Sequence, residues 1–144
     1  MQDSKTYTAL ALAGTLPFMA CALLPLLGYD SIGRLGPLDE VVASYGLAIV
    51  CFLAGSHWGI FLSGRSADSL NLFIISNIIF LAAWFAYIGA GVKLAIGTQI
   101  LVFVTLLFID LRLKQNLVIS SVYFRVRSVA TLIAVVSLLT VLTQ

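Results

Sequence analysis

The stretch from Val41 to Gly64 reads VVASYGLAIVCFLAGSHWGIFLSG and contains no charged residue. A helix needs about 20 mostly apolar residues to cross the hydrocarbon core of a bilayer, so this run is long enough to span one. It also contains His57, the only histidine of the chain. A titratable side chain inside a span costs free energy and usually has a functional reason. The run therefore predicts a membrane span that carries a candidate functional residue.

The composition of the whole chain agrees with a membrane protein. Of its 144 residues, 61% are hydrophobic and 10% are charged, whereas soluble domains are roughly 45–50% apolar and about 25% charged. We therefore expect the lipid bilayer to be the main partner of the chain. The net charge is only +2, and no block of like charges occurs, so the sequence predicts no nucleic-acid binding.

Uncharged runs recur along the chain and predict its fold class. Together they favour an all-α polytopic membrane protein, a bundle of five transmembrane helices in one integral-membrane domain of residues 1–144. Pro17 and Pro25 lie in the first span, where a proline permits a kink. The expected spans cover residues 7–28, 39–63, 69–91, 94–111 and 121–143.

The distribution of lysine and arginine predicts the orientation. In a five-span arrangement only Arg34 and Lys93 lie on one side of the membrane. Cytoplasmic loops carry an excess of these cations, so the other side should face the cytoplasm. We therefore expect a multi-pass protein of the bacterial inner membrane, with a cytoplasmic N-terminus and a periplasmic C-terminus. The cations on the expected cytoplasmic side are Lys5, Arg65, Arg112, Lys114, Arg125 and Arg127.

Polar side chains gather in the cytoplasmic half of the expected bundle. An unpaired charge is costly in hydrocarbon, so Asp110 is expected to pair with Arg125 or Arg127. A shared cluster of this kind can bind a ligand or relay protons. The candidate residues for these roles are His57, Asn77, Asp110, Tyr123, Arg125 and Arg127.

The role of His57 has three interpretations. It can form a structural hydrogen bond to a neighbouring helix, for instance to Asn77. It can relay protons or contact a ligand. It can also ligate haem, which would need a second ligand or an open site, and no other histidine exists. Apart from this haem option, no cofactor is predicted.

Small residues beside His57 predict close helix packing. Gly55 and Gly59 form a G-x-x-x-G pair, and Ser63 extends the same stripe. His57 points away from the stripe, because two residues turn a helix by about 200°. The pattern does not distinguish a contact within the chain from one in a homo-oligomer or a larger membrane complex.

The sequence contains no catalytic nucleophile triad, phosphate-binding loop, zinc motif or carboxylate pair. We therefore predict no catalytic residue and no metal site. The favoured hypothesis is a non-enzymatic helper that binds a lipid, a quinone or a partner membrane complex through the polar cluster. The alternative is a small homo-oligomeric transporter or channel with His57 in a proton or ligand path.

Motifs along nearly the whole chain resemble those of one family. They are Leu12-Ala13-Gly14-Thr15-Leu16-Pro17-Phe18, Tyr45-Gly46, Phe52-Leu53-Ala54-Gly55-Ser56-His57-Trp58-Gly59, Trp84, Asp110, Tyr123-Phe124-Arg125-Val126-Arg127 and Thr131. The chain thus resembles domain of unknown function 3429, which includes bacterial proteins and mitochondrial transmembrane protein 69. It departs from the family at Ala54, usually a glycine, and at Val122, often a tryptophan. The resemblance implies a five-helix inner-membrane protein and no known activity.

Overall fold

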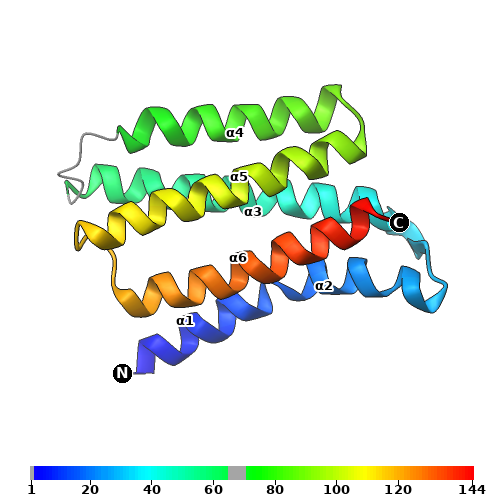
Figure 1. The fold of residues 1–144 in the computed structure, drawn as a ribbon, viewed down its shortest axis with the longest axis horizontal. Helices are drawn as coiled ribbons and strands as arrows, with labels where there is room; N and C mark the ends of the chain where they lie inside the picture. Colours follow the sequence, from blue (N-terminus) through cyan, green and yellow to red (C-terminus); the bar gives the residue numbers. More distant parts are fainter. Residues whose placement is uncertain (1, 65–70) are drawn as a thin grey trace.

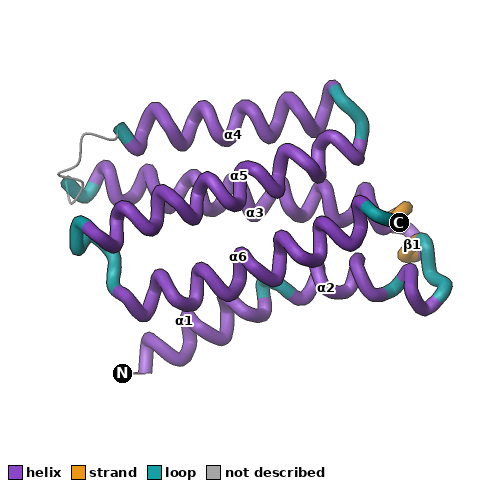
Figure 2. Tube along the Cα trace, viewed as in Figure 1, coloured by secondary structure: helices purple, strands orange, loops and turns teal. Residues whose placement is uncertain are grey.

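The computed structural model describes residues 2–64 and 71–144 and shows an all-α bundle (Figures 1 and 2). Five segments are long and apolar enough to cross a membrane, so the predicted class of a five-span membrane bundle is confirmed. The spans are Lys5–Leu23, Leu38–Leu62, Leu72–Gly89, Val92–Gln115 and Ser121–Leu142. The elements are α1 (Gln2–Ala13), α2 (Leu16–Leu23), η1 (Pro25–Leu27), β1 (Ser31–Ile32), η2 (Gly33–Leu35), β2 (Gly36–Pro37), α3 (Leu38–Leu62), α4 (Leu72–Gly89), α5 (Val92–Gln115) and α6 (Ser121–Leu142).

The first span is interrupted between α1 and α2. Pro17 lies in the first turn of α2, where its missing N–H disrupts no helical hydrogen bond. The helix therefore breaks before the proline, at Gly14 and Thr15. The Tyr45 hydroxyl donates to the Gly14 carbonyl at 2.8 Å, which satisfies a backbone group released by the break.

The connections between helices are short. Only Ala90 and Gly91 separate α4 from α5, and Gly91 has a φ of 77°, a conformation that glycine adopts without steric cost. Two helices are capped at their N-termini by side chains. Asn71 accepts a hydrogen bond from the Ile74 N–H at the start of α4, and Ser120 accepts one from the Tyr123 N–H at the start of α6. Between α2 and α3, β1 pairs antiparallel with β2.

Helix α3 packs against α2, α4 and α5, while α6 packs against α2 and α5. Helix α1 packs against α6. One polar contact joins α3 to α5 in the core: the Gln99 Nε2 donates to the Ala43 carbonyl at 2.7 Å. A Cβ at Gly46 would meet the end of the Gln99 side chain, so a larger residue at this position would force Gln99 to shift.

Cations gather at one end of the bundle. The N-terminus, the ends of α3 and α5 and the starts of α4 and α6 all lie at this end, on the left of Figure 1. Arg34 and Lys93 belong to the opposite end, while Arg65 lies outside the described residues. The described cations at or near the N-terminal end are Lys5, Arg112, Lys114, Arg125 and Arg127.

Candidate functional site

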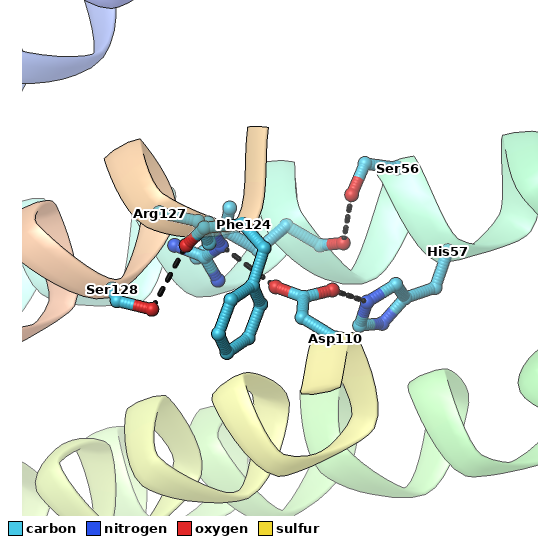
Figure 3. Close-up of polar contacts among 7 residues, drawn as sticks. Ser56, His57, Asp110, Phe124, Arg127 and Ser128 are labelled. Atoms are coloured by element: carbon cyan, nitrogen blue, oxygen red, sulfur yellow. Dashed lines mark hydrogen bonds and ion pairs between the residues drawn. The ribbon is translucent and has the colours of Figure 1, made fainter. Parts of the chain in front are cut away.

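Three polar side chains from three helices, two of them buried and one partly buried, form one cluster (Figure 3). His57 of α3 lies 2.8 Å from Asp110 of α5, measured from Nε2 to Oδ1. Arg127 of α6 lies 3.0 Å from the same carboxylate, measured from Nε to Oδ2. The side chains of His57, Asp110 and Arg127 are 2%, 3% and 11% exposed. The predicted pairing of Asp110 with one of the two arginines is therefore confirmed, for Arg127.

Helical periodicity places the three side chains at the centre. Each belongs to a face of its helix that repeats every three or four residues and points into the bundle. The cluster is therefore anchored in the packed core on all three helices. These faces include Val50, Leu53 and His57 on α3, Leu106, Asp110 and Leu113 on α5, and Arg127, Thr131 and Ala134 on α6.

The hydrogen bonds define the charge arrangement. Because an ionised carboxylate only accepts, the His57 Nε2 carries the proton in its bond to Asp110. The opposite charges of Arg127 and Asp110 balance, which offsets part of the cost of burying them. Within the described residues, neither His57 Nδ1 nor Arg127 Nη2 has a hydrogen-bond partner.

A cavity of about 480 Å³ lies beside this cluster, between α1, α2, α3, α5 and α6. Its volume lies within the roughly 300–1,000 Å³ of small-molecule sites. We call it the Arg127 cavity. It is lined by Tyr7, Leu10, Ala11, Gly14, Thr15, Phe18, Ile49, Phe52, Leu53, Ser56, Phe103, Tyr123, Val126, Arg127, Ala130, Thr131 and Ala134.

The Arg127 cavity is polar at one end and apolar along the rest. Arg127 and Tyr123 line it near the start of α6, which is the cation-rich end. Ala134 lines it seven residues further along α6, about 10 Å deeper. Leu10 and Phe52 line it and are 69% and 73% exposed, so it opens to the outer surface between α1 and α3. In a bilayer this opening faces hydrocarbon.

Two residues of this lining carry a buried polar atom without a hydrogen-bond partner. Arg127 Nη2 and Thr131 Oγ1 are buried and have no hydrogen-bond partner among the residues described. Buried polar groups are nearly always paired, so each such exception calls for an explanation. Both atoms are enclosed by protein, so they do not face the open space of the cavity.

The other predicted site residues have different positions. The Asn77 amide donates to the Phe73 carbonyl of its own helix at 2.7 Å, so Asp110 and not Asn77 is the hydrogen-bond partner of His57. Tyr123 stacks on Tyr7, with 5.9 Å between ring centroids, and both line the Arg127 cavity. Arg125 is exposed and belongs neither to the cluster nor to the cavity lining.

The glycine stripe is on the outer surface of α3. Gly55, Gly59 and Ser63 are exposed, and a Cβ at either glycine would meet no described atom within 4 Å. His57 points to the opposite side, as its spacing predicts. The stripe is therefore no contact within the described chain, and its role in a homo-oligomer stays a prediction.

Sequence reasoning did not identify Tyr7, Ser56 and Thr131 as site residues. Thr131 had a usable signal, since it follows Arg127 by one helical turn and both belong to the resemblance motifs. No sequence signal pointed to Tyr7, because only tertiary packing brings it beside Tyr123, which lies near the other end of the chain.

Two neighbouring polar side chains of α3 are engaged in hydrogen bonds. The Ser56 hydroxyl donates to the Leu53 carbonyl at 2.7 Å. The His57 Nε2 is engaged by Asp110, and His57 does not line the Arg127 cavity. In the described ranges, no group of three or more histidine, cysteine or acidic residues could hold a metal ion.

Comparison with known proteins identifies one protein family that matches the chain. A family model described as "Protein of unknown function (DUF3429)" matches residues 4–143. No curated protein and no solved structure matches the chain.

Proposed function

The chain belongs to the DUF3429 family of proteins of unknown function, and we propose from its own residues that it binds an amphipathic, lipid-like molecule. The binding site is the Arg127 cavity. The ligand has an apolar chain and a head that carries an oxygen acceptor, a chemistry that single-chain lipids and quinones share. This role is non-enzymatic.

One observation carries this proposal: Arg127 is the charged residue in the described lining of a mostly apolar cavity that opens to hydrocarbon. An oxygen acceptor on the ligand would lie beside the Arg127 side chain. The polar end of the cavity is near the bundle end, and the apolar end is deeper. A lipid of the adjacent leaflet has the same polarity, so it could enter sideways without turning over.

Filling the cavity tests this function. Ala130 lines the cavity, so the phenylalanine side chain of Ala130→Phe should occupy the space that the apolar chain of the ligand needs. Ala82 is exposed on α4, and Ala82→Phe is the matched control. Native mass spectrometry after mild extraction should find a bound amphiphile on the wild type and on Ala82→Phe, and at most about a tenth of it on Ala130→Phe.

Two results would contradict the proposal. One is an empty wild type that also binds no added fatty acid, lysolipid or quinone. The other is a folded Ala130→Phe variant with wild-type occupancy.

We also propose that the protein resides in the bacterial inner membrane with the cation-rich end in the cytoplasm. A periplasm-active reporter fused after Gln144 should then be active, and a cytoplasm-active one should not. The reverse pattern would contradict this orientation. The transporter alternative stays a prediction.

A further inference from the structure

The turn between α5 and α6, at the cation-rich end of the bundle (Figure 1), holds a leucine in a conformation that leucine disfavours. Leu117 has a φ of 59°, and among the described residues it is the only one besides glycine with a positive φ. Its N–H donates to the Lys114 carbonyl at 3.0 Å, and the Val118 N–H donates to the Leu113 carbonyl at 2.9 Å. This pair of hydrogen bonds ends α5 in a motif whose left-handed position is usually a glycine. A leucine here is strained, since its Cβ crowds the following carbonyl oxygen.

The packing of the chain does not account for the Leu117 side chain. This side chain is 91% exposed, the largest exposed fraction of any large hydrophobic residue in the described ranges. The apolar contact that usually accompanies such a helix end is left to Val118, which packs against the core that contains Leu113. Glycine would suit the backbone better, so the leucine indicates a binding partner outside the chain.

Positive charge surrounds this turn. Arg112 and Lys114 lie in the last turn of α5. The Lys114 ammonium lies 5.0 Å from the centre of the Phe124 ring of α6, which holds the charge beside the turn without neutralising it. Neither cation forms an ion pair with a described residue, and no aspartate or glutamate occurs from residue 111 to residue 144. The turn is therefore complementary to a negatively charged partner.

The depth of the turn in the membrane selects the kind of partner. Lys93 and Arg112 bracket most of α5, and a rise of about 1.5 Å per residue puts them roughly 28 Å apart. This separation matches the hydrocarbon core of about 30 Å, so the two cations fit its boundaries. Leu117 follows Arg112 by five residues, which puts it in the headgroup layer, roughly 5–8 Å thick. An exposed leucine there can bury its side chain where the acyl chains begin.

We propose that the α5–α6 turn binds an anionic phospholipid of the adjacent leaflet. Leu117 inserts among the acyl chains just below the headgroups, while Arg112 and Lys114 attract the phosphate groups. Each cation near an anionic surface contributes about fivefold in affinity. None of these three residues lines the Arg127 cavity, so this site is separate from the one proposed above and does not depend on it.

The depth of residue 117 tests the insertion directly. Leu117→Cys can carry a spin label in bilayers of phosphatidylcholine and phosphatidylglycerol, once Cys51→Ala has removed the exposed native cysteine. The label should be accessible to oxygen, which concentrates in lipid, and protected from a water-soluble nickel complex. The opposite accessibility would place the side chain in water. That result would overturn the proposal and favour an acidic protein partner.

Substitutions test the lipid preference through native mass spectrometry of the purified protein with added lipid. The wild type should bind phosphatidylglycerol at least tenfold more tightly than phosphatidylcholine. Leu117→Gly should weaken phosphatidylglycerol binding at least threefold. Its unfolding midpoint in SDS should stay equal or rise, because glycine relieves the backbone strain. Arg112→Gln combined with Lys114→Gln should weaken the binding at least tenfold.

Matched controls come from the opposite end of the bundle and from the other site. Leu35 is 67% exposed at that opposite end, and Leu35→Gly should leave phosphatidylglycerol binding within twofold of the wild type. Arg34→Gln combined with Lys93→Gln removes the same number of charges and should also leave it within twofold. Ala130→Phe, which fills the Arg127 cavity, should have no larger effect.

The proposal is overturned if phosphatidylglycerol binds no more tightly than phosphatidylcholine, or if a folded Leu117→Gly variant binds it as tightly as the wild type. Equal losses in the two double variants would show a general attraction between charges and would overturn it too. Because Ala130→Phe separates the two sites, none of these results decides whether the Arg127 cavity holds an amphiphile.

Discussion

Asp110 is the residue on which the polar cluster depends. It is 3% exposed and accepts hydrogen bonds from both His57 and Arg127. Removing its carboxylate would leave a buried guanidinium without a counter-ion. Breaking a buried ion pair in this way costs about 3–5 kcal/mol, more than the intact pair contributes.

A double-mutant cycle checks this dependence. Asp110→Ala should lower the free energy of unfolding in micelles by about 3–5 kcal/mol. Combined with Arg127→Ala, the effects should be non-additive by about 1–3 kcal/mol, because the two side chains touch. Combined with Arg125→Ala they should add to within about 0.5 kcal/mol. Equal coupling to both arginines would show that the ion pair is not specific.

The sequence predicted the members of the cluster better than their contacts. An unpaired carboxylate in hydrocarbon costs so much free energy that a cationic partner for Asp110 could be predicted from this cost alone. The choice of Arg127 over Arg125 depends on the rotational phase of α6, because the two lie about 200° apart on the helix. That phase is set by packing against α2 and α5. For the same reason Asn77 could not be excluded as a partner of His57.

The position of the Gln99 side chain between α3 and α5 depends on Gly46. Gln99 fills the space where a Cβ at this position would lie, and it bonds the Ala43 carbonyl. Gly55, on the same helix, faces open space. The two glycines thus provide a matched pair, one in a tight helix contact and one on the outer surface.

Gly46→Ala should therefore lower the free energy of unfolding by about 1–3 kcal/mol through overpacking. Gly55→Ala should leave it unchanged or raise it by about 0.5–1 kcal/mol, because alanine is the better helix former. SDS-induced unfolding of both variants measures the difference. A Gly46→Ala variant as stable as Gly55→Ala would disprove the tight contact.

The spans could be predicted from hydropathy, since hydrocarbon thickness sets their length. The break at Gly14 and Thr15 was foreseen only as a kink. Helix α5 continues to Gln115, past the predicted end of its span at residue 111, because Arg112 and Lys114 suit the negative end of the helix dipole. Small residues look the same in sequence whether they pack or face lipid, so the position of the stripe could not be predicted.

The Arg127 cavity is a property of the whole bundle. The break in the first span lets α1 pack against α6 while α2 packs against both α3 and α6. The remaining space between them is the cavity. Such a space depends on how five helices fit together, and no run of residues encodes it. Residues of its lining come from both ends of the chain, as the Tyr7–Tyr123 stack shows.

The most direct measurement is the affinity of a single-chain amphiphile, with an oxygen acceptor in its head, for three purified forms of the protein: wild type, Arg127→Gln and Arg125→Gln. All three should carry the same fold by circular dichroism. The account predicts that Arg127→Gln binds at least tenfold more weakly than the wild type, and that Arg125→Gln binds within twofold of it. Equal affinity of all three forms would contradict the claim that Arg127 holds the head of a ligand in this cavity.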